Sequence, residues 1–285
     1  MSLIFFLLKL NYDIVILVIK MDKSFQFKKK FGQNFLKNDQ IINDIVNVAD
    51  IKEDSLVIEV GPGAGILTKK LSKVAKQVLC YEIDTDLEDI LASAFLDCPN
   101  VTVLFEDFLN ANIKEEIKAY EFSHIYFVSN VPYYITTPIL MKLMQSKIKF
   151  EKIVMMVQKE VGERFSALPG KRDYSSISVY LNYYYDVKKE FIVKRTEFIP
   201  SPNVDSIIIS FSNKEELLSL KDEEHFFKLV KDSFKFKRKT IRNNLKNYDL
   251  DKVELVLKNY NMDLTTRAES LNERIFADIS NKLSE

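Results

Sequence analysis

Short apolar runs alternate with segments of helical periodicity along most of the chain. Apolar runs of strand length lie at residues 56–60, 78–82, 101–105 and 124–129, and residues 39–48, 66–71 and 136–145 have the spacing of helices. Continuous apolar runs between helices are typical of parallel strands that are buried on both faces. The pattern therefore predicts an α/β fold.

Further runs at residues 152–158, 191–195 and 205–211 predict three more strands, which gives a Rossmann-like sheet of seven strands. Residues 159–168 and 175–185 are expected to be helices, and the tyrosines of the second are expected to pack and not to stack on bases. Beyond residue 213 the pattern is wholly helical. We therefore predict a main domain at residues 21–212 and a small C-terminal all-α domain at residues 213–285.

The first twenty residues differ from the rest of the chain. They are strongly apolar, but Lys9, Asn11 and Asp13 interrupt the apolar stretch, which is too short to span a bilayer. A basic start and a small-residue cleavage site, as in a secretory signal, are both missing. We interpret residues 1–20 as a non-native or disordered extension before Met21 and expect no membrane contact.

Composition restricts the function without identifying it. The chain has 41 basic and 41 acidic residues, so net charge indicates no partner. Cys80 and Cys98 lack the spacing of a metal or redox motif, and His124 and His225 lie far apart in sequence. We expect a reducing, cytoplasmic location and no metal site.

A glycine turn follows the first predicted strand, in the sequence Glu59-Val-Gly-Pro-Gly-Ala-Gly65. The spacing G-x-G-x-G, with Gly61 and Gly63, is not the G-x-G-x-x-G of dinucleotide folds. Glu82 ends the next strand, where it could accept hydrogen bonds from both hydroxyls of a ribose. Glu59 would repel a pyrophosphate but would suit a cation, and S-adenosylmethionine combines an adenosine, an ammonium and a sulfonium.

Polar groups also follow the third and fourth predicted strands. Asp107 could accept from an adenine amine while Phe108 packs on the ring. The fourth strand leads to Asn130-Val131-Pro132-Tyr133. The Asn130 side chain and the Val131 carbonyl could accept both N–H groups of an adenine amine, with Tyr133 stacked on the base and Pro132 fixing the backbone. Parallel strands place all these groups at one edge of the sheet.

Basic residues are concentrated between residues 228 and 246. This segment contains eight basic residues and a single acidic one, Asp232. Phe234 and Phe236 are interleaved with them. We expect a helix carrying Lys237, Arg238 and Arg242 to bind RNA phosphates. Because the whole chain is neutral, docking on one face of a large structured RNA is favoured over sliding along any polyanion.

Several motifs together resemble the ribosomal RNA adenine N6-dimethyltransferases, and within that family the branch that modifies the small ribosomal subunit. The resemblance runs from about residue 27 to the C-terminus. Its motifs lie at residues 31–36, 59–65, 130–138, 156–161, 198–206 and 237–245. Val131 and Ser175 depart from the usual family residues, and Val131 would still offer its carbonyl.

The resemblance implies roles for particular residues. It places cofactor contacts at Asn34, Leu36, Gly61, Glu82, Asp107 and Asn130. From the residues themselves we also expect Gly63, in the glycine turn, and Phe108, after the third strand, to contact the cofactor. It also places the loop of Phe198 beside the target base, as a second face of its pocket. The implied cofactor is S-adenosyl-L-methionine.

The predicted activity is transfer of methyl groups to N6 of two adjacent adenosines near the 3′ end of small-subunit ribosomal RNA. The expected partner is that RNA or a precursor of the small subunit, and the protein is expected to be a monomer. One alternative is a large-subunit adenine methyltransferase of the macrolide-resistance type. A non-catalytic RNA-binding assembly factor is a second alternative, and a dinucleotide-dependent oxidoreductase is the weakest.

Overall fold

A computed structural model describes residues 35–285 of the chain. The predicted extension at residues 1–20, the basic segment after it and the predicted cofactor residue Asn34 lie outside the described residues. None of the helices between residues 35 and 285 combines the length and the apolar character that a membrane crossing requires.

The sheet has seven strands, as the sequence predicts. Their order is β4-β3-β2-β5-β6-β9-β7. The bounds are β2 Ser55–Val60, β3 Gln77–Tyr81, β4 Val101–Leu104, β5 His124–Asn130, β6 Lys152–Gln158, β7 Tyr185–Val193 and β9 Ser206–Asn213. Strands β2 to β6 pair in parallel. The order reverses between β2 and β5, and ligands of α/β sheets bind at the carboxyl ends of strands at such a point.

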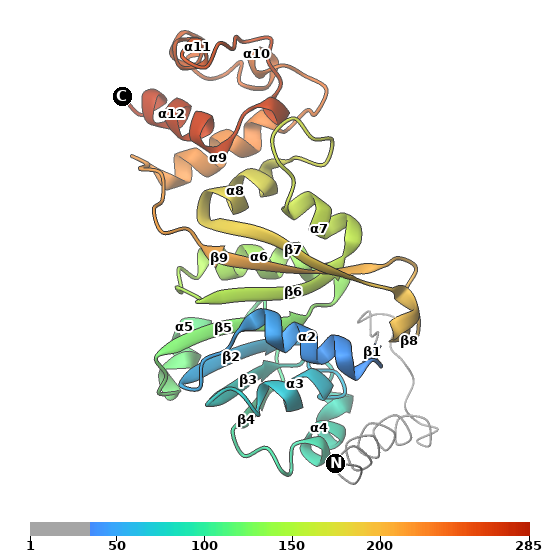
Figure 1. Cartoon of the computed structure of the whole chain (residues 1–285). Helices are drawn as coiled ribbons and strands as arrows, with labels where there is room; N and C mark the ends of the chain where they lie inside the picture. The colour runs from blue at the N-terminus through green and yellow to red at the C-terminus, as the bar shows by residue number, and fades with distance from the viewer. Residues whose placement is uncertain (1–34) are drawn as a thin grey trace. The chain divides into compact units, whose positions relative to one another are not determined.

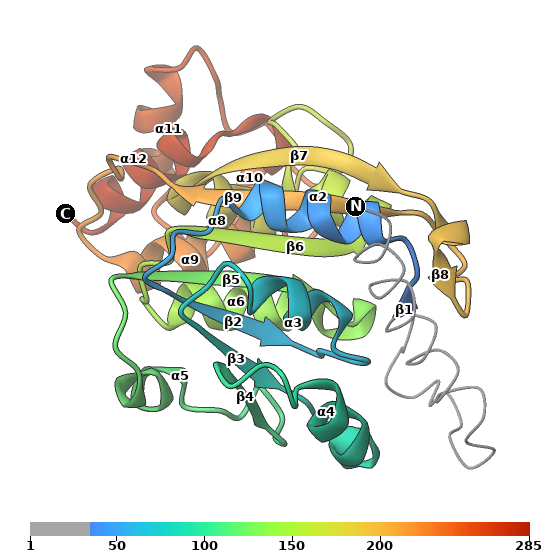
Figure 2. The ribbon, with the colours of Figure 1, turned by 60° about the horizontal axis from the view of Figure 1, so that its bottom comes forward.

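Helices cover both faces of the parallel strands (Figure 1). Helices α2 (Asp39–Ala49) and α3 (Ile66–Leu71) lie on one face and α6 (Thr136–Gln145) on the other, as the turned view also shows (Figure 2). The shorter α4 (Glu88–Ala94) and α5 (Ile113–Glu116) follow β3 and β4. The buried stripe of α2, which includes Ile42 and Ile45, packs with Val57, Val128 and Val154 of the sheet. This packing is the hydrophobic core beneath the strand ends.

Two features of the strands were not predicted. Strand β7 starts at Tyr185 and not at residue 191, because it lies at the edge of the sheet, where Asp186, Lys188 and Lys189 are exposed. A small second sheet pairs β1 (Phe35–Leu36) with β8 (Phe198–Ile199) in antiparallel register. Two-residue strands are too short to show any periodicity in a sequence.

The chain forms two compact units. The first comprises the described residues up to Lys159 together with Glu190–Ser210, and the second comprises Glu160–Lys189 and Phe211–Glu285. The second unit thus takes in residues 160–189, which the sequence analysis assigns to the main domain.

Aromatic packing explains why residues 160–189 join the second unit, since α8 (Ser176–Tyr184) lies against α9 (Glu223–Ser233). The rings of Tyr180 and Phe227 are 4.6 Å apart, those of Tyr183 and Phe226 are 5.2 Å apart, and the Tyr180 hydroxyl donates to the Phe227 carbonyl over 2.8 Å. These tyrosines pack within the unit, as expected. Helix α7 (Lys159–Phe165) precedes them.

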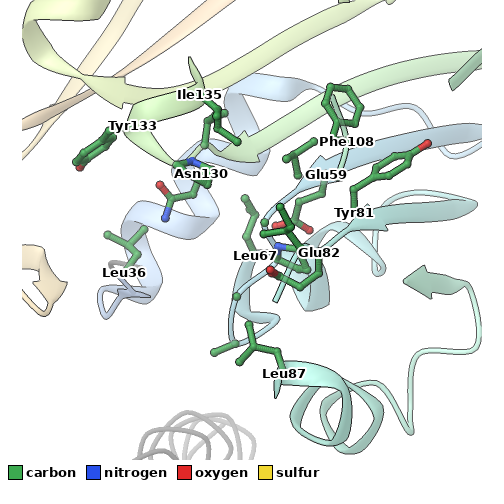
Figure 3. A pocket seen from close by; sticks show the side chains of 18 of the residues that line it. Leu36, Glu59, Leu67, Tyr81, Glu82, Leu87, Phe108, Asn130, Tyr133 and Ile135 are labelled. Atoms are coloured by element: carbon green, nitrogen blue, oxygen red, sulfur yellow. The ribbon is translucent and has the colours of Figure 1, made fainter. Parts of the chain in front are cut away.

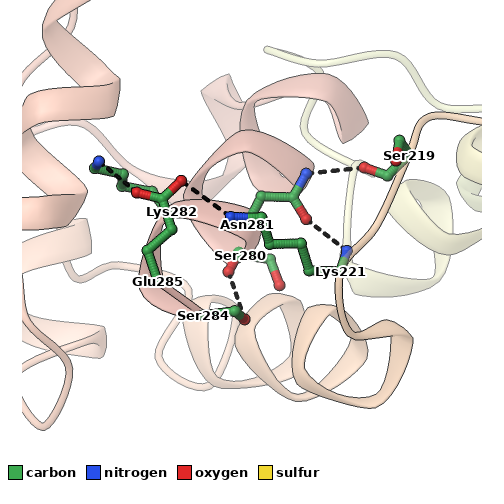
Figure 4. Close-up of polar contacts among 7 residues, drawn as sticks. All are labelled: Ser219, Lys221, Ser280, Asn281, Lys282, Ser284 and Glu285. Carbon is green, nitrogen blue, oxygen red and sulfur yellow. Dashed lines mark hydrogen bonds and ion pairs between the residues drawn. The ribbon is translucent and has the colours of Figure 1, made fainter.

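The C-terminal part of the second unit contains α10 (Ile241–Asn244), α11 (Leu250–Lys258) and α12 (Glu273–Leu283). Asn281 fixes α12 to the segment that enters α9, because its side chain accepts from the Lys221 N–H and donates to the Ser219 carbonyl, both over 2.8 Å (Figure 4). Glu285 adds ion pairs with Lys221 and Lys282. The last turn of the chain is therefore held by side chains on both sides.

The basic segment is not the continuous helix that we predicted. Helix α9 ends at Ser233 and α10 begins at Ile241, so Lys237 and Arg238 lie in the connecting loop and only Arg242 is helical. The side chain of Asn244 accepts from the Phe236 N–H over 3.1 Å and donates to the Phe236 carbonyl over 3.2 Å. These two bonds satisfy backbone groups that a helix would otherwise pair.

Candidate functional site

A pocket of about 200 Å³ opens at the carboxyl ends of the parallel strands, within the first compact unit. Figure 3 shows the Asn130 amide and the Glu82 carboxylate in this pocket, with Tyr133 beyond Asn130 and Phe108 beside Tyr81. Most of the predicted site residues line it, namely Leu36, Gly61, Gly63, Glu82, Asp107, Phe108, Asn130, Pro132 and Tyr133. The structure thus brings together side chains from four strand ends, as the parallel topology requires.

The glycine turn lets the backbone of β2 approach the loop after β5. Gly61 has φ +72°, in the left-handed region, and its N–H donates to the Tyr81 carbonyl over 2.8 Å. A Cβ atom at position 61 would lie 3.5 Å from the Pro132 ring. The Pro132 ring therefore lies where a side chain at position 61 would touch it, on the wall of the pocket.

Glu59, near the end of β2, also lines the pocket. Its side chain is 1% exposed and accepts from the Thr68 hydroxyl over 2.7 Å. Burial raises the pKa of Glu59 to about 8, against the opposing hydrogen bonds from Thr68 and Cys80. Glu59 thus joins β2 to α3 through a buried hydrogen bond, and its predicted attraction of a cation stays a prediction.

Glu82 lies just after β3 and is 5% exposed. One carboxylate oxygen accepts from the Asp84 N–H over 2.9 Å. Burial raises the pKa of Glu82, whereas the backbone N–H groups of Asp84 and Gly63 lower it. A carboxylate has further lone pairs, so Glu82 can accept additional hydrogen bonds from a ligand in the pocket.

The wall after β4 is fixed by several contacts. Asp107 accepts from the Leu109 N–H over 2.9 Å. The Phe108 ring is 2% exposed and meets the Tyr81 ring edge-on, with centroids 5.0 Å apart. Lys142 lies 5.3 Å from the centre of the Phe108 ring and donates to the Ala111 carbonyl over 2.6 Å. Phe108 therefore forms a rigid apolar wall.

The segment after β5 is held by hydrogen bonds on both sides of Asn130. The Ser129 hydroxyl donates to the Val60 carbonyl over 2.6 Å, which ties β5 to β2. The Ile135 N–H donates to the Pro132 carbonyl over 3.1 Å, at the start of the 3-10 turn Tyr133–Ile135. The backbone that carries Asn130 is thus positioned before any ligand binds.

Tyr133 is anchored by a residue far along the chain. Its hydroxyl lies 2.6 Å from the hydroxyl of Ser206, which is fully buried at the start of β9. Burial raises the pKa of Tyr133 despite this hydrogen bond. The anchor determines how the Tyr133 ring lies at the edge of the pocket.

Tyr134 and Ile83 also line the pocket and were not predicted from the sequence. Tyr134 is 54% exposed, and burial of its hydroxyl together with the negative charges of Asp107 and Glu82 raises its pKa. Ile83 is exposed and directly follows Glu82. The available signal was their position: each follows a predicted site residue in the same turn.

Other predicted site residues lie elsewhere. Phe198 is 2% exposed and pairs through its backbone with Leu36. It packs in the core cluster with Ile42 and does not line the pocket. We therefore correct its predicted role from a second face for the target base to core packing. Lys237, Arg238 and Arg242 belong to the second compact unit.

The chain matches one protein family over most of its length. The family model described as ribosomal RNA adenine dimethylase matches residues 24–285. The chain is 43% identical over 270 residues to ribosomal RNA small subunit methyltransferase A of Streptococcus thermophilus (strain ATCC BAA-491 / LMD-9), covering 92% of this chain and 93% of that protein. It is 44% identical over 264 residues to the protein of the same name in Staphylococcus aureus (strain JH9), covering 90% and 89%.

Two solved structures share the fold over most of their length. A dimethyladenosine transferase from Plasmodium falciparum is 28% identical, with a TM-score of 0.73 over 86% of this chain and 95% of that one. The 23S rRNA methyltransferase ErmE is 26% identical, with a TM-score of 0.70 over 88% of this chain and 100% of that one.

Proposed function

The chain belongs to the ribosomal RNA adenine dimethylase family, and on that basis we propose that it dimethylates N6 of two adjacent adenosines near the 3′ end of small-subunit ribosomal RNA. It is an S-adenosylmethionine-dependent methyltransferase. The observation that carries the assignment of roles is the shared pocket, in which Asn130, Pro132 and Tyr133 lie with Glu82 and the glycine turn.

The pocket residues suit S-adenosylmethionine, which supplies the electrophilic methyl group when bound. Glu82 would accept from the ribose hydroxyls, and these charge-assisted bonds would be strong because the carboxylate is buried. Asp107 would accept from the adenine amine, with Phe108 and Ile83 as apolar walls. The glycine turn, at Gly61 and Gly63, would allow close approach of the methionine part. Leu36 would close the pocket. Asn34 stays a predicted cofactor contact.

Asn130 would activate the target amine. The lone pair of an adenine amine is delocalised into the ring, so the amine attacks well only when its N–H groups are accepted by the protein. The Asn130 side-chain oxygen would accept one N–H group and the Val131 carbonyl the other. No strong base is needed, because the amine becomes acidic once it is methylated. Catalysis would come mainly from orientation and from electrostatic stabilisation.

Tyr133 would stack on the adenine after the base leaves its helix. Extruding a base costs a few kcal/mol, and stacking on an aromatic ring recovers part of that free energy. The Ser206 hydrogen bond holds the Tyr133 ring before the base arrives, so less side-chain entropy is lost on binding. Pro132, whose ring a side chain at position 61 would touch, would keep Tyr133 and Asn130 directed at the same base.

The partner that we propose is the small-subunit RNA itself or a precursor particle. Lys237, Arg238 and Arg242 are exposed in the second compact unit and would bind its phosphates. Both cysteines are free thiols, which fits a reducing cytoplasm where ribosomes are assembled. We further propose that the protein acts as a monomer.

A large-subunit enzyme remains the second candidate, because ErmE has nearly the same fold. The names of the relatives at 43–44% identity support the small-subunit reading. A purely structural assembly factor is disfavoured because the pocket retains Asn130 and Glu82.

The test is to incubate the protein and labelled S-adenosylmethionine with unmethylated small and large ribosomal subunits. The modified nucleosides are then identified by mass spectrometry. We expect N6,N6-dimethyladenosine in small-subunit RNA only, and none with Asn130→Ala. Label in large-subunit RNA would favour the second candidate.

A further inference from the structure

One exposed aromatic ring lies in the basic loop between α9 and α10. Among residues 36–285, Tyr134 and Phe236 are the large aromatic side chains with high exposure, and Phe236 is 56% exposed. Tyr134 lines the pocket already described, whereas Phe236 belongs to the second compact unit. An exposed phenylalanine contributes little to folding, since its apolar area stays in water.

The backbone of Phe236 is nevertheless held in one position. The Asn244 side chain bonds both its N–H and its carbonyl, and the Lys239 N–H donates to the same carbonyl over 2.9 Å. Just before the loop, the Phe234 ring lies 6.0 Å from the buried Tyr174 and 6.0 Å from the buried Phe276. The loop is therefore anchored from inside while Phe236 faces outward.

Basic residues flank Phe236 in the loop. Lys235, Lys237, Arg238 and Lys239 are all exposed, and the Lys235 ammonium lies 5.7 Å from the centre of the Phe236 ring. A second basic segment lies beside the loop, because the Lys237 ammonium donates to the Arg172 carbonyl over 2.7 Å.

The sequence around Arg172 contributes further charge. Lys171, Arg172 and Asp173 are exposed, so Asp173 is the single acid among these two short segments, residues 171–173 and 235–239. Segments more than sixty positions apart in sequence thus form one cationic surface within the second unit.

We propose that Phe236 is a stacking platform for an unpaired RNA base, with the phosphates on either side bound by the basic residues of the loop. Nucleic-acid sites without base readout combine an aromatic ring with a cationic groove in this way. Within a duplex the bases are stacked on one another, so no base face is accessible to the Phe236 ring. The surface therefore fits a single-stranded segment of the RNA. The inference rests on the proposed function and specifies which part of the RNA the second unit recognises.

The test uses the full-length protein and a short single-stranded adenosine oligomer that carries one 2-aminopurine, with a blunt RNA duplex of equal length as the second probe. Phe236→Ala should weaken binding of the single strand roughly tenfold and should abolish the quenching of 2-aminopurine. Phe236→Trp should restore both. Binding of the duplex should not change.

Two controls separate stacking from charge and from folding. Leu255→Ala removes an apolar side chain of similar exposure (54%) from α11 of the same unit and should bind both probes like the parent. Arg238→Gln should lower the log–log salt slope by about 0.7, the value for one phosphate contact on a single strand, whereas Phe236→Ala should leave the slope unchanged. Equal loss on both probes, or no loss with Phe236→Ala at an unchanged melting temperature, would overturn the proposal.

The binding test is also independent of the proposed activity. If the parent protein fails to methylate small subunits but still quenches the oligomer through Phe236, the proposed function fails and the platform stands. If it methylates normally and Phe236→Ala binds like the parent, the platform alone fails.

Discussion

The hydroxyl groups of Tyr133 and Ser206 lie 2.6 Å apart, joining the loop after β5 to the start of β9. Through this contact a fully buried serine, remote in sequence, sets the orientation of the aromatic ring beside Asn130.

We predict that Ser206→Ala lowers kcat about fivefold, because one neutral hydrogen bond contributes about 1 kcal/mol. Tyr133→Phe should have a similar effect, and the double variant should be no worse than either single one. Single-turnover rates of the three variants, each compared with the parent, give the coupling free energy between Tyr133 and Ser206. Additive losses would mean that the hydrogen bond does not act through the ring.

Glu82→Ala should weaken S-adenosylmethionine by roughly 2–3 kcal/mol, the value of charge-assisted hydrogen bonds in a buried site. Glu88→Ala is the matched control, since Glu88 is exposed and does not line the pocket. Titration calorimetry measures both affinities. An affinity for Glu82→Ala equal to that of the control would remove Glu82 from the cofactor site.

The free energy of unfolding should depend on the protonation of Glu59. Its pKa is about 8 in the folded chain, against an ordinary value of 4.5, so the folded state binds the proton more tightly. Stability is therefore lost as pH rises from about 4.5 to about 8, by at most about 1.4 kcal/mol per pH unit from this one group. Below that range the group is protonated in both states, so its contribution to stability is fully present and no longer changes with pH.

Glu59→Gln should flatten this part of the pH profile, because the amide remains neutral throughout. Its advantage over the parent should grow between pH 5 and pH 8, as measured by urea unfolding. A parallel pair of profiles would show that Glu59 titrates normally.

Gly65→Ala should destabilise the first compact unit by about 1–3 kcal/mol. Position 65 has φ +76°, and a Cβ atom there would come within 2.7 Å of the Phe95 ring. Gly170→Ala separates the two causes, since Gly170 has φ +80° with nothing within 4 Å of the added atom. Its cost should be the backbone part alone, about 1–2 kcal/mol. Equal costs for both variants would show that the Phe95 ring moves aside easily.

The sheet and the pocket were predictable because both follow from local patterns. Apolar runs define β2 to β6, and parallel strands leave no choice about which edge receives Glu82, Asp107 and Asn130. The raised pKa of Glu59 was not predictable, because it depends on burial by residues from elsewhere in the chain.

Long-range contacts explain the other differences. A phenylalanine in this loop looks the same in the sequence whether its side chain contacts a ligand or packs in the core. The pairing of Phe198 with Leu36, which places Phe198 in the core cluster, is visible only in the structure. The basic residues around Arg238 are in a loop because Asn244 satisfies the backbone of Phe236. Charge density along a sequence does not distinguish a loop from a solvated helix.

The most direct test of the central assignment is single-turnover methyl transfer by Asn130→Ala, measured together with its affinity for S-adenosylmethionine. We expect methyl transfer to be abolished while the affinity stays within about tenfold (~1.4 kcal/mol) of the parent, because the proposed role of Asn130 is chiefly to act on the target amine. Asn259→Ala, an exposed asparagine at the end of α11, should leave both quantities unchanged. A near-normal single-turnover rate for Asn130→Ala would contradict the role proposed for the pocket.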